Sequence, residues 1–409
     1  MKKFLLLSVA VLLLASLILS GCSQTTTTPP AQSPAKTTTA PPPSSTTAAP
    51  PKTTTAPPVS TAAPVTTTAP QPSSTATITL RFNSKTQPSL ASAVDSFNWL
   101  VSEVSKQTQG RIKITLYLSG ALAGPPQAYD ALINGVMDIN EGAPNDSPGR
   151  FPATDICDLP WGFPSTWAGT HALNDWYFNF KPAEWSQTVV MLLDCTNPAL
   201  IGTANKPVRT LADLKGLNIR SGGNIENGEL TALGAVPRPV NLGEVPGALS
   251  KGVVDGILLS PEAYPAFKLF DSIKYITDIG AIAPAAPAYM AMNKDAWNKL
   301  SAQDQQILLK AVQDSGFLRA QYIDRDLQSA VTTFKSLPGK EWITLPASEI
   351  TKWQAAANVA TTDYIQNISS KGMPAADYTK YLQERLAYWA KQTPPPLPSI
   401  AAPASSPAK

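Results

Sequence analysis

The stretch TITLRFNSKTQPSLASAVDSFNWLVSEVSKQTQGRIKITLYL (77–118) contains a strand, a helix and a second strand. Residues 77–82 alternate in polarity, as expected of a strand with one buried face. Apolar residues spaced for one face of a helix follow, namely Leu90, Val94, Phe97, Val101 and Val104, and Gly110 ends the pattern. A second strand over 111–118, a helix entered at Gly124-Pro125-Pro126 and a third strand over 136–140 complete the unit. This β-α-β-α-β order predicts a parallel sheet with helices on its faces.

The same alternation resumes after residue 188 and predicts a second α/β lobe. A buried strand is expected over 189–195 and further strands over 217–220 and 288–294, with short helices between them. The chain is mostly helical from Ser301 onward. Thr210 and Asp213 stand where a capping box would begin a short helix. The chain crosses between the lobes more than once. In such sheets ligands sit at the carboxyl ends of strands, often between lobes.

The first residues have the pattern of an export signal. Lys2 and Lys3 precede an apolar run, which ends in Leu-Ser-Gly-Cys at residues 19–22. This ending resembles the bacterial lipobox, so we expect a lipoprotein signal peptide over 1–21 and acylation of Cys22. The alternative is an ordinary signal peptide that happens to contain a cysteine. An exported chain also permits a disulfide between Cys157 and Cys195, although two free buried thiols are an equal alternative.

Two segments of low complexity flank the folded region. Residues 22–76 are rich in Thr and Pro and contain no aromatic or acidic residue, and residues 393–409 are rich in Pro, Ala and Ser. Such compositions predict a disordered tether and a disordered tail. All charges in these flanks and the signal are lysines, and the remaining 27 basic and 29 acidic residues are nearly balanced. A nucleic-acid partner is therefore not expected.

Catalytic and metal motifs are absent from the sequence. The chain has one histidine, His171, and no Gly-x-Ser-x-Gly, His-Glu-x-x-His, Walker A or Gly-x-Gly-x-x-Gly motif. We expect His171 to have a packing role, and we expect neither an enzyme nor a bound cofactor or metal. What remains is a set of polar or aromatic residues near strand ends, which are candidate ligand contacts: Asn83, Asn145, Trp161, Phe163, Arg220, Ser260 and Tyr264.

The folded region resembles the solute-binding subunit of tripartite ATP-independent periplasmic (TRAP) transporters, of the dicarboxylate-binding-protein type. The segments that carry the resemblance occur in order and are GRIKITLYLSGAL, AYDALINGVMDIN, GRFPATDICDLPWGFPS, LADLKGLNIR and LGAVPRPVNLGEVPGALSKGVVDGI. The resemblance implies a two-lobed periplasmic-binding-protein fold of the Venus flytrap type, with a ligand cleft between the lobes. It places lobe I at 77–198 plus about 286–325, and lobe II at 199–285 plus about 326–392.

The resemblance also implies a function. A monomeric lipid-anchored receptor would capture a small organic acid outside the cytoplasmic membrane and deliver it to an integral-membrane permease of two subunits. Arg220, at the end of its strand, would form a salt bridge with the ligand carboxylate, because a planar guanidinium pairs bidentately with a carboxylate.

Two departures from the family pattern bear on the ligand. Leu200 and Ile201 stand where many members have a second arginine, and Ser260-Pro261-Glu262 replaces a Glu-Asn-Pro-like segment. Fewer polar partners suggest a more apolar ligand that carries one carboxylate. The rival functions are a receptor for an ABC importer or a sensor, a surface lipoprotein without ligand, and a secreted α/β hydrolase.

Overall fold

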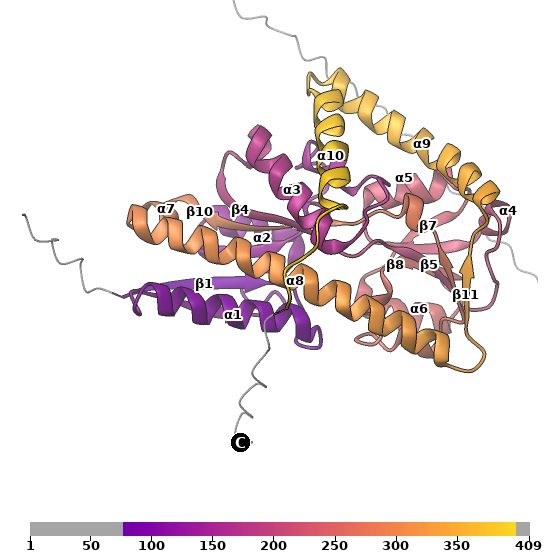
Figure 1. Ribbon diagram of the computed structural model, residues 1–409, viewed down its shortest axis with the longest axis horizontal. Coiled ribbons are helices and arrows are strands. Elements are labelled where there is room, and N and C mark those ends of the chain that lie inside the picture. The colour runs from indigo at the N-terminus through magenta and orange to yellow at the C-terminus, as the bar shows by residue number, and fades with distance from the viewer. Residues whose placement is uncertain (1–76, 398–409) are drawn as a thin grey trace, which may run out of the picture. The chain divides into compact units, whose positions relative to one another are not determined.

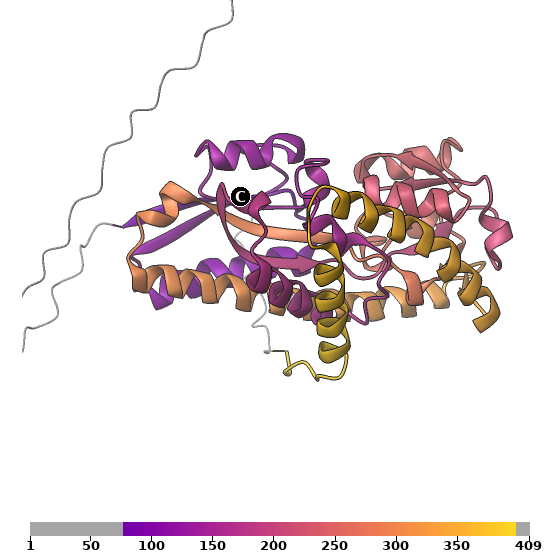
Figure 2. The same cartoon turned by 90° about the horizontal axis from the view of Figure 1, so that it is seen from above.

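The structure is a computed structural model that describes residues 77–397, all of which belong to one compact unit. The predicted signal peptide, Cys22, the Thr/Pro-rich tether and the end of the tail lie outside these residues. None of the helices within 77–397 is both long enough and apolar enough to cross a membrane. The described chain forms two sheets, each covered by helices (Figures 1 and 2).

The first sheet has five strands in the order β2-β1-β3-β10-β4. The strands β1 (Ile78–Ser84), β2 (Ile112–Tyr117) and β3 (Ile139–Gly142) are parallel, and they are connected by α1 (Ala91–Gln107) and α2 (Pro125–Ile133). This confirms the predicted β-α-β-α-β unit. The strand β10 (Pro287–Asn293) is inserted antiparallel between β3 and β4 (Thr188–Cys195). We call this sheet and its helices lobe I.

The second sheet has six strands in the order β11-β9-β5-β8-β6-β7 and forms lobe II. Its strands are β5 (Leu200–Thr203), β6 (Asn218–Ser221), β7 (Val236–Pro239), β8 (Gly256–Leu259), β9 (Tyr275–Asp278) and β11 (Glu341–Thr344). The short helices α4 (Leu211–Leu214), α5 (Asn224–Ala232) and α6 (Val245–Ser250) connect them. The carboxylate of Asp213 accepts a hydrogen bond from the backbone N–H of Thr210 at 2.9 Å, which confirms the predicted capping box.

Two long helices, α8 (Ala302–Ser336) and α9 (Ala347–Ser370), follow the last strand of lobe I. After α7 (Lys294–Asn298), α8 packs against α1 and β4 of lobe I and continues to β11 of lobe II (Figures 1 and 2). The helix α9 lies against α5 of lobe II. Because α8 is continuous, it connects the lobes without a break at the predicted boundary near residue 325.

The last helix lies in lobe I, which corrects the predicted boundary. The helix α10 (Ala375–Trp389) packs against α3 (Thr166–Phe180), and its Tyr378, Leu382 and Leu386 belong to the lobe I core. The ring of His171 on α3 is stacked on Trp389 at 4.0 Å and on Phe317 at 3.8 Å. His171 therefore packs between aromatic side chains, and the assignment of all of 326–392 to lobe II is wrong for α10.

The described part of the predicted tail is also placed on lobe I. Pro395 and Pro396 line a hollow of about 390 Å³ together with Trp99, Trp167 and His171. Both prolines are exposed, and the disorder of residues 393–409 stays a prediction.

Candidate ligand site at the junction of the lobes

Arg220 is the buried cation of lobe II. It lies on β6 between β7 and β8, and it is 9% exposed. Its Nε donates a hydrogen bond to the carbonyl oxygen of Val240 at 3.0 Å. Within 77–397, neither Nη1 nor Nη2 has a hydrogen-bond partner. Burial lowers the pKa of Arg220, and the negative charge of Glu226 opposes that shift. The guanidinium is therefore fixed at one nitrogen and has two further donor groups to offer to an anion.

The two glycines after Arg220 bring groups from both lobes together. A Cβ atom at residue 222 would lie 3.4 Å from Nη1 and Nη2 of Arg220 and 3.3 Å from Oε2 of Glu226. A Cβ atom at residue 223 would lie 3.0 Å from the Cβ of Asn145, which belongs to lobe I. The structure therefore places Asn145 next to the segment that carries Arg220, as required of two residues that share an interlobe site.

Two of the predicted aromatic residues, Trp161 and Phe163, lie in a lobe I segment that faces lobe II. Trp161 is half-buried, and its Nε1 donates to the carbonyl oxygen of Ile156 at 2.8 Å. Trp161 and Ile225 of α5 pack against the same apolar cluster. Gly162, between the two aromatic residues, has a φ of +68°, and a Cβ there would lie 2.7 Å from the carbonyl oxygen of Ala281 in lobe II. This close approach of the backbones requires glycine.

Phe163 points away from this junction. It is 3% exposed and packs onto α3, where a Cβ at Gly169 would lie 2.8 Å from Cδ1 of Phe163. The ring therefore belongs to the lobe I core. Of Trp161 and Phe163, only Trp161 retains exposed surface near the junction.

Asn83 is fully engaged inside lobe I. Its Nδ2 donates to Oδ1 of Asn140 at 2.9 Å and to the carbonyl oxygen of Ala123 at 3.2 Å, and its Oδ1 accepts from the N–H of Leu122 at 3.1 Å. Asn140 in turn donates to the hydroxyl of Tyr289 at 3.1 Å. The side chain thus anchors the 122–123 loop to the sheet, and the structure does not bring it to Arg220.

Ser260 and Tyr264 are both buried in lobe II. Ser260 is 3% exposed, and its hydroxyl donates to the carboxylate of Glu262. Tyr264 belongs to the lobe II core, where its hydroxyl faces Gly202 and has no hydrogen-bond partner among the described residues. The two residues flank the helical segment Pro261–Ala263, which follows β8 directly.

Polar contacts fix the segments that cross between the lobes. The N–H of Thr196 donates to the carbonyl oxygen of Ala286 at 3.0 Å, and that of Ala199 donates to Pro284 at 2.8 Å. The amide of Asn197 donates to the carbonyl oxygen of Ile323 in α8 at 2.9 Å. The two crossing segments and α8 therefore meet beside Asn197, which sequence reasoning did not single out.

Three buried carboxyl groups were also missed by the sequence analysis. Asp158 ends a short helix in lobe I (Thr154–Asp158), and Glu226 and Glu229 lie one turn apart on α5 of lobe II. Burial raises the pKa of each. The negative charge of Glu226 adds to this shift for Asp158 and Glu229, whereas Arg220 opposes it for Glu226. Within residues 77–397, no group of His, Cys, Asp and Glu is arranged to hold a metal ion, and Cys157 and Cys195 are free and buried.

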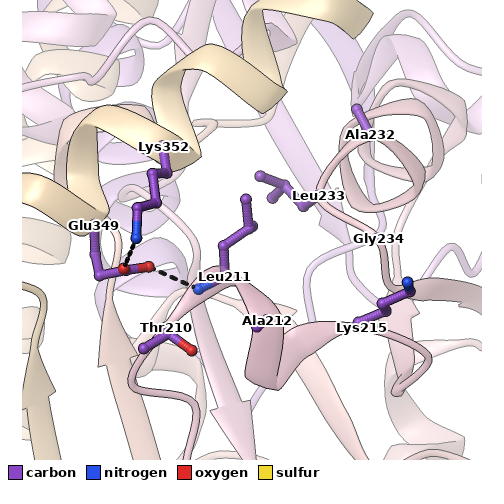
Figure 3. Close-up of a pocket in the computed structure, with 9 residues that line it drawn as sticks. All are labelled: Thr210, Leu211, Ala212, Lys215, Ala232, Leu233, Gly234, Glu349 and Lys352. Carbon is purple, nitrogen blue, oxygen red and sulfur yellow. Dashed lines mark hydrogen bonds and ion pairs between the residues drawn. The ribbon is translucent and has the colours of Figure 1, made fainter.

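A surface hollow of about 570 Å³ lies elsewhere on lobe II (Figure 3). It is lined by Leu211 and Leu233 and by the charged side chains of Lys215, Glu349 and Lys352. Both carboxylate oxygens of Glu349 already have partners there. One pairs with Lys352 at 2.6 Å and the other accepts from the N–H of Leu211 at 3.0 Å. None of the predicted ligand residues lines this hollow or the one beside the proline tail.

Comparison with known proteins identifies the family. The model of bacterial extracellular solute-binding protein, family 7, matches residues 83–367. The chain belongs to this family. It is a family of binding proteins, which confirms the expectation that the chain is not an enzyme. The family 7 assignment and the two-lobed α/β fold confirm the resemblance to TRAP solute-binding proteins.

Individual relatives of this family 7 protein have known ligands. It is 26% identical over 271 residues to the 2,3-diketo-L-gulonate-binding periplasmic protein YiaO of Escherichia coli, which covers 65% of this chain and 80% of YiaO. A marine metagenome TRAP solute-binding protein specific for aromatic acid ligands aligns with a TM-score of 0.71 and 26% identity, over 76% of this chain and 99% of that one. A TRAP solute-binding protein of Rhodoferax ferrireducens in complex with benzoate aligns with a TM-score of 0.69 and 26% identity, over 77% and 99%.

Proposed function

We propose that this family 7 protein captures a small organic acid between its lobes, outside the cytoplasmic membrane, and delivers it to a two-subunit TRAP permease. The observation that carries the proposal is the buried guanidinium of Arg220, fixed through Nε to Val240 with Nη1 and Nη2 directed to no described residue. A carboxylate accepts from two such donors at once, and partial burial strengthens charge-assisted hydrogen bonds. Asn145 would close over the ligand from lobe I.

The ligand skeleton is proposed to be apolar, with one carboxylate. Leu200 and Ile201 stand where a second arginine would be, both are buried, and Trp161 has exposed aromatic surface near the junction. The benzoate and aromatic-acid complexes of the two related TRAP proteins are consistent with this class. Succinate or malate binding far better than any aromatic or branched monocarboxylate would overturn this part of the proposal.

The test is a thermal-shift screen of the purified protein against a panel of organic acids. A ligand at about 100 times its dissociation constant stabilises the folded state by roughly 2.7 kcal/mol. We expect the ligand to stabilise the wild type fully and Arg220→Lys to a smaller extent. It should not stabilise Arg220→Ala. Arg238→Ala is a matched control, because Arg238 pairs with Arg220 in register on β7 but is exposed. Equal stabilisation of wild type and Arg220→Ala would assign Arg220 a structural role.

We also propose that Cys22 carries the lipid that holds the protein at the membrane, as the Leu-Ser-Gly-Cys sequence indicates. The expected result is that the wild type is found in the membrane fraction of the bacterium, whereas Cys22→Ser is found in the soluble fraction. Recovery of both in the soluble fraction would leave an ordinary signal peptide as the explanation.

A further inference from the structure

Three nearly fully buried carboxyl groups meet where lobe I faces α5 of lobe II. Asp158, Glu226 and Glu229 are 2%, 6% and 1% exposed. Glu226 and Glu229 lie three residues apart on one face of α5, and α5 contacts the helical segment that Asp158 ends. Glu226 also lies beside Arg220, because both approach Gly222. The carboxyl groups therefore adjoin the proposed carboxylate clamp.

The hydrogen bonding of these groups differs from that of Glu184, a half-buried carboxylate of lobe I. Glu184 accepts from the N–H groups of Ala153 and Thr154, both at 2.8 Å, and from the Thr154 hydroxyl at 2.5 Å. In contrast, neither oxygen of Glu229 nor Oδ1 of Asp158 has a partner within the described chain. A buried carboxyl group without donors is costly, so these oxygens are suited to receive donors from a bound molecule.

The local charges indicate what those donors should be. Among residues 77–397, Arg220 is the cation whose charge acts on this group, and it acts on Glu226. In the described part of the chain, no cation opposes the effect of burial on the pKa of Asp158 or Glu229, and nearby Asp155 raises the pKa of Asp158 further. A ligand with only a carboxylate would offer no donor to the unpartnered oxygens of Asp158 and Glu229. A ligand that also carries a protonated amine would supply up to three donors, and its positive charge would favour ionisation of these carboxyl groups.

We propose that the ligand is an amino-bearing carboxylate, with its carboxylate on Arg220 and its ammonium group between Asp158 and Glu229. This assignment rests on the proposed function and narrows its substrate class. It retains the apolar skeleton and adds one cationic group to it. Glu226, between the two charges, would be shared by the guanidinium and the ammonium group.

The test compares carboxylates that differ only in an amine. The probes are L-phenylalanine against 3-phenylpropanoate and 4-(aminomethyl)benzoate against 4-methylbenzoate, with affinities measured by titration calorimetry on the purified protein. We expect the amino-bearing member of at least one pair to bind at least 10-fold more tightly. Asp158→Asn and Glu229→Gln should reduce that advantage, whereas Glu244→Gln, at an exposed position with no assigned contact, should retain it.

A second readout does not depend on the variants folding. Because the pKa of each carboxyl group is raised, binding of an ammonium group should release protons, which the dependence of the heat on buffer ionisation enthalpy measures. The deaminated member of the pair should release none. The proposal is overturned if no amino-bearing probe binds more tightly than its partner, or if the advantage survives in both variants. If the plain carboxylates bind and Arg220→Ala abolishes that binding, the proposed function stands and only the amine assignment fails.

Discussion

Asn145 of lobe I packs directly onto the backbone of Gly223 of lobe II, three residues beyond Arg220. A Cβ at residue 223 would lie 3.0 Å from the Cβ and 3.2 Å from Nδ2 of Asn145. The φ of Gly223 is −168°, an extended conformation that any residue adopts, so the requirement for glycine is one of space. The lobes can approach this closely at Arg220 because two glycines follow it.

Gly223→Ala should therefore weaken ligand binding without unfolding the protein. The added methyl group would oppose the close approach of Asn145, and a ligand that selects the closed arrangement must then overcome that cost. We expect an affinity loss of about 10-fold, which corresponds to about 1.4 kcal/mol. Titration calorimetry with the best acid from the thermal-shift screen measures it.

Gly228→Ala is the matched control for this prediction. Gly228 lies on α5, and a Cβ there would meet no atom within 4 Å. Alanine in a helix interior is favoured over glycine by up to about 1 kcal/mol, so this variant should be slightly more stable and bind normally. Equal affinities of the two variants would show that the contact with Asn145 does not limit closure.

Asn83→Ala should reduce stability rather than binding. The substitution removes the acceptor for the N–H of Leu122 and the donor to Asn140, and it leaves buried polar groups without partners. We expect a loss of about 1–3 kcal/mol in the free energy of unfolding, measured by urea denaturation. Asn98→Ala, at an exposed position on α1, should change it by less than about 0.5 kcal/mol. A selective loss of ligand affinity at unchanged stability would restore Asn83 as a ligand contact.

The sequence predicted local elements better than the surroundings of individual side chains. The alternation of strands and helices, the Thr210–Asp213 cap and the position of Arg220 on a strand all depend on short-range patterns, and the structure contains them. The third strand was expected to start at residue 136, yet β3 begins at Ile139. The reason is long-range, because Asp138 accepts from the N–H and Nε of Arg81 on β1 at 2.7 and 3.0 Å.

Contacts between distant segments account for the remaining differences. An amphipathic pattern shows that α10 has an apolar face, but it does not say which lobe that face covers. A position after a strand likewise does not say whether a side chain points to the cleft or the core, which is why Tyr264 was assigned to the ligand site. Asp158 and Glu229 are 71 residues apart in the chain, so no spacing could indicate that they meet.

Tyr264→Phe should leave ligand affinity unchanged and should not destabilise the fold. The Tyr264 hydroxyl is buried without a partner among the described residues, so removing it relieves a desolvation cost of up to about 1 kcal/mol. Tyr289→Phe provides the contrast, because that hydroxyl accepts from Asn140 at 3.1 Å and its removal should cost about 1 kcal/mol. Thermal melting of both variants measures the difference. A loss of affinity in Tyr264→Phe would place the hydroxyl in the ligand site.

Asp155→Asn should stabilise the protein more at pH 8 than at pH 5. Burial, and to a lesser extent the nearby Glu184, raises the pKa of Asp155 to about 7 in the folded protein, against about 3.9 for an unfolded chain. Between these two values the folded state retains a proton that the unfolded state has lost. The contribution of Asp155 to stability therefore falls as the pH rises from about 4 to about 7, by up to about 4 kcal/mol. Asparagine does not ionise and removes this dependence.

Urea unfolding of Asp155→Asn and of the wild type at both pH values measures the gain in stability, with Asp363→Asn on the exposed face of α9 as the control. An equal effect of Asp155→Asn at pH 5 and pH 8 would mean that Asp155 is already ionised in the folded protein at pH 5.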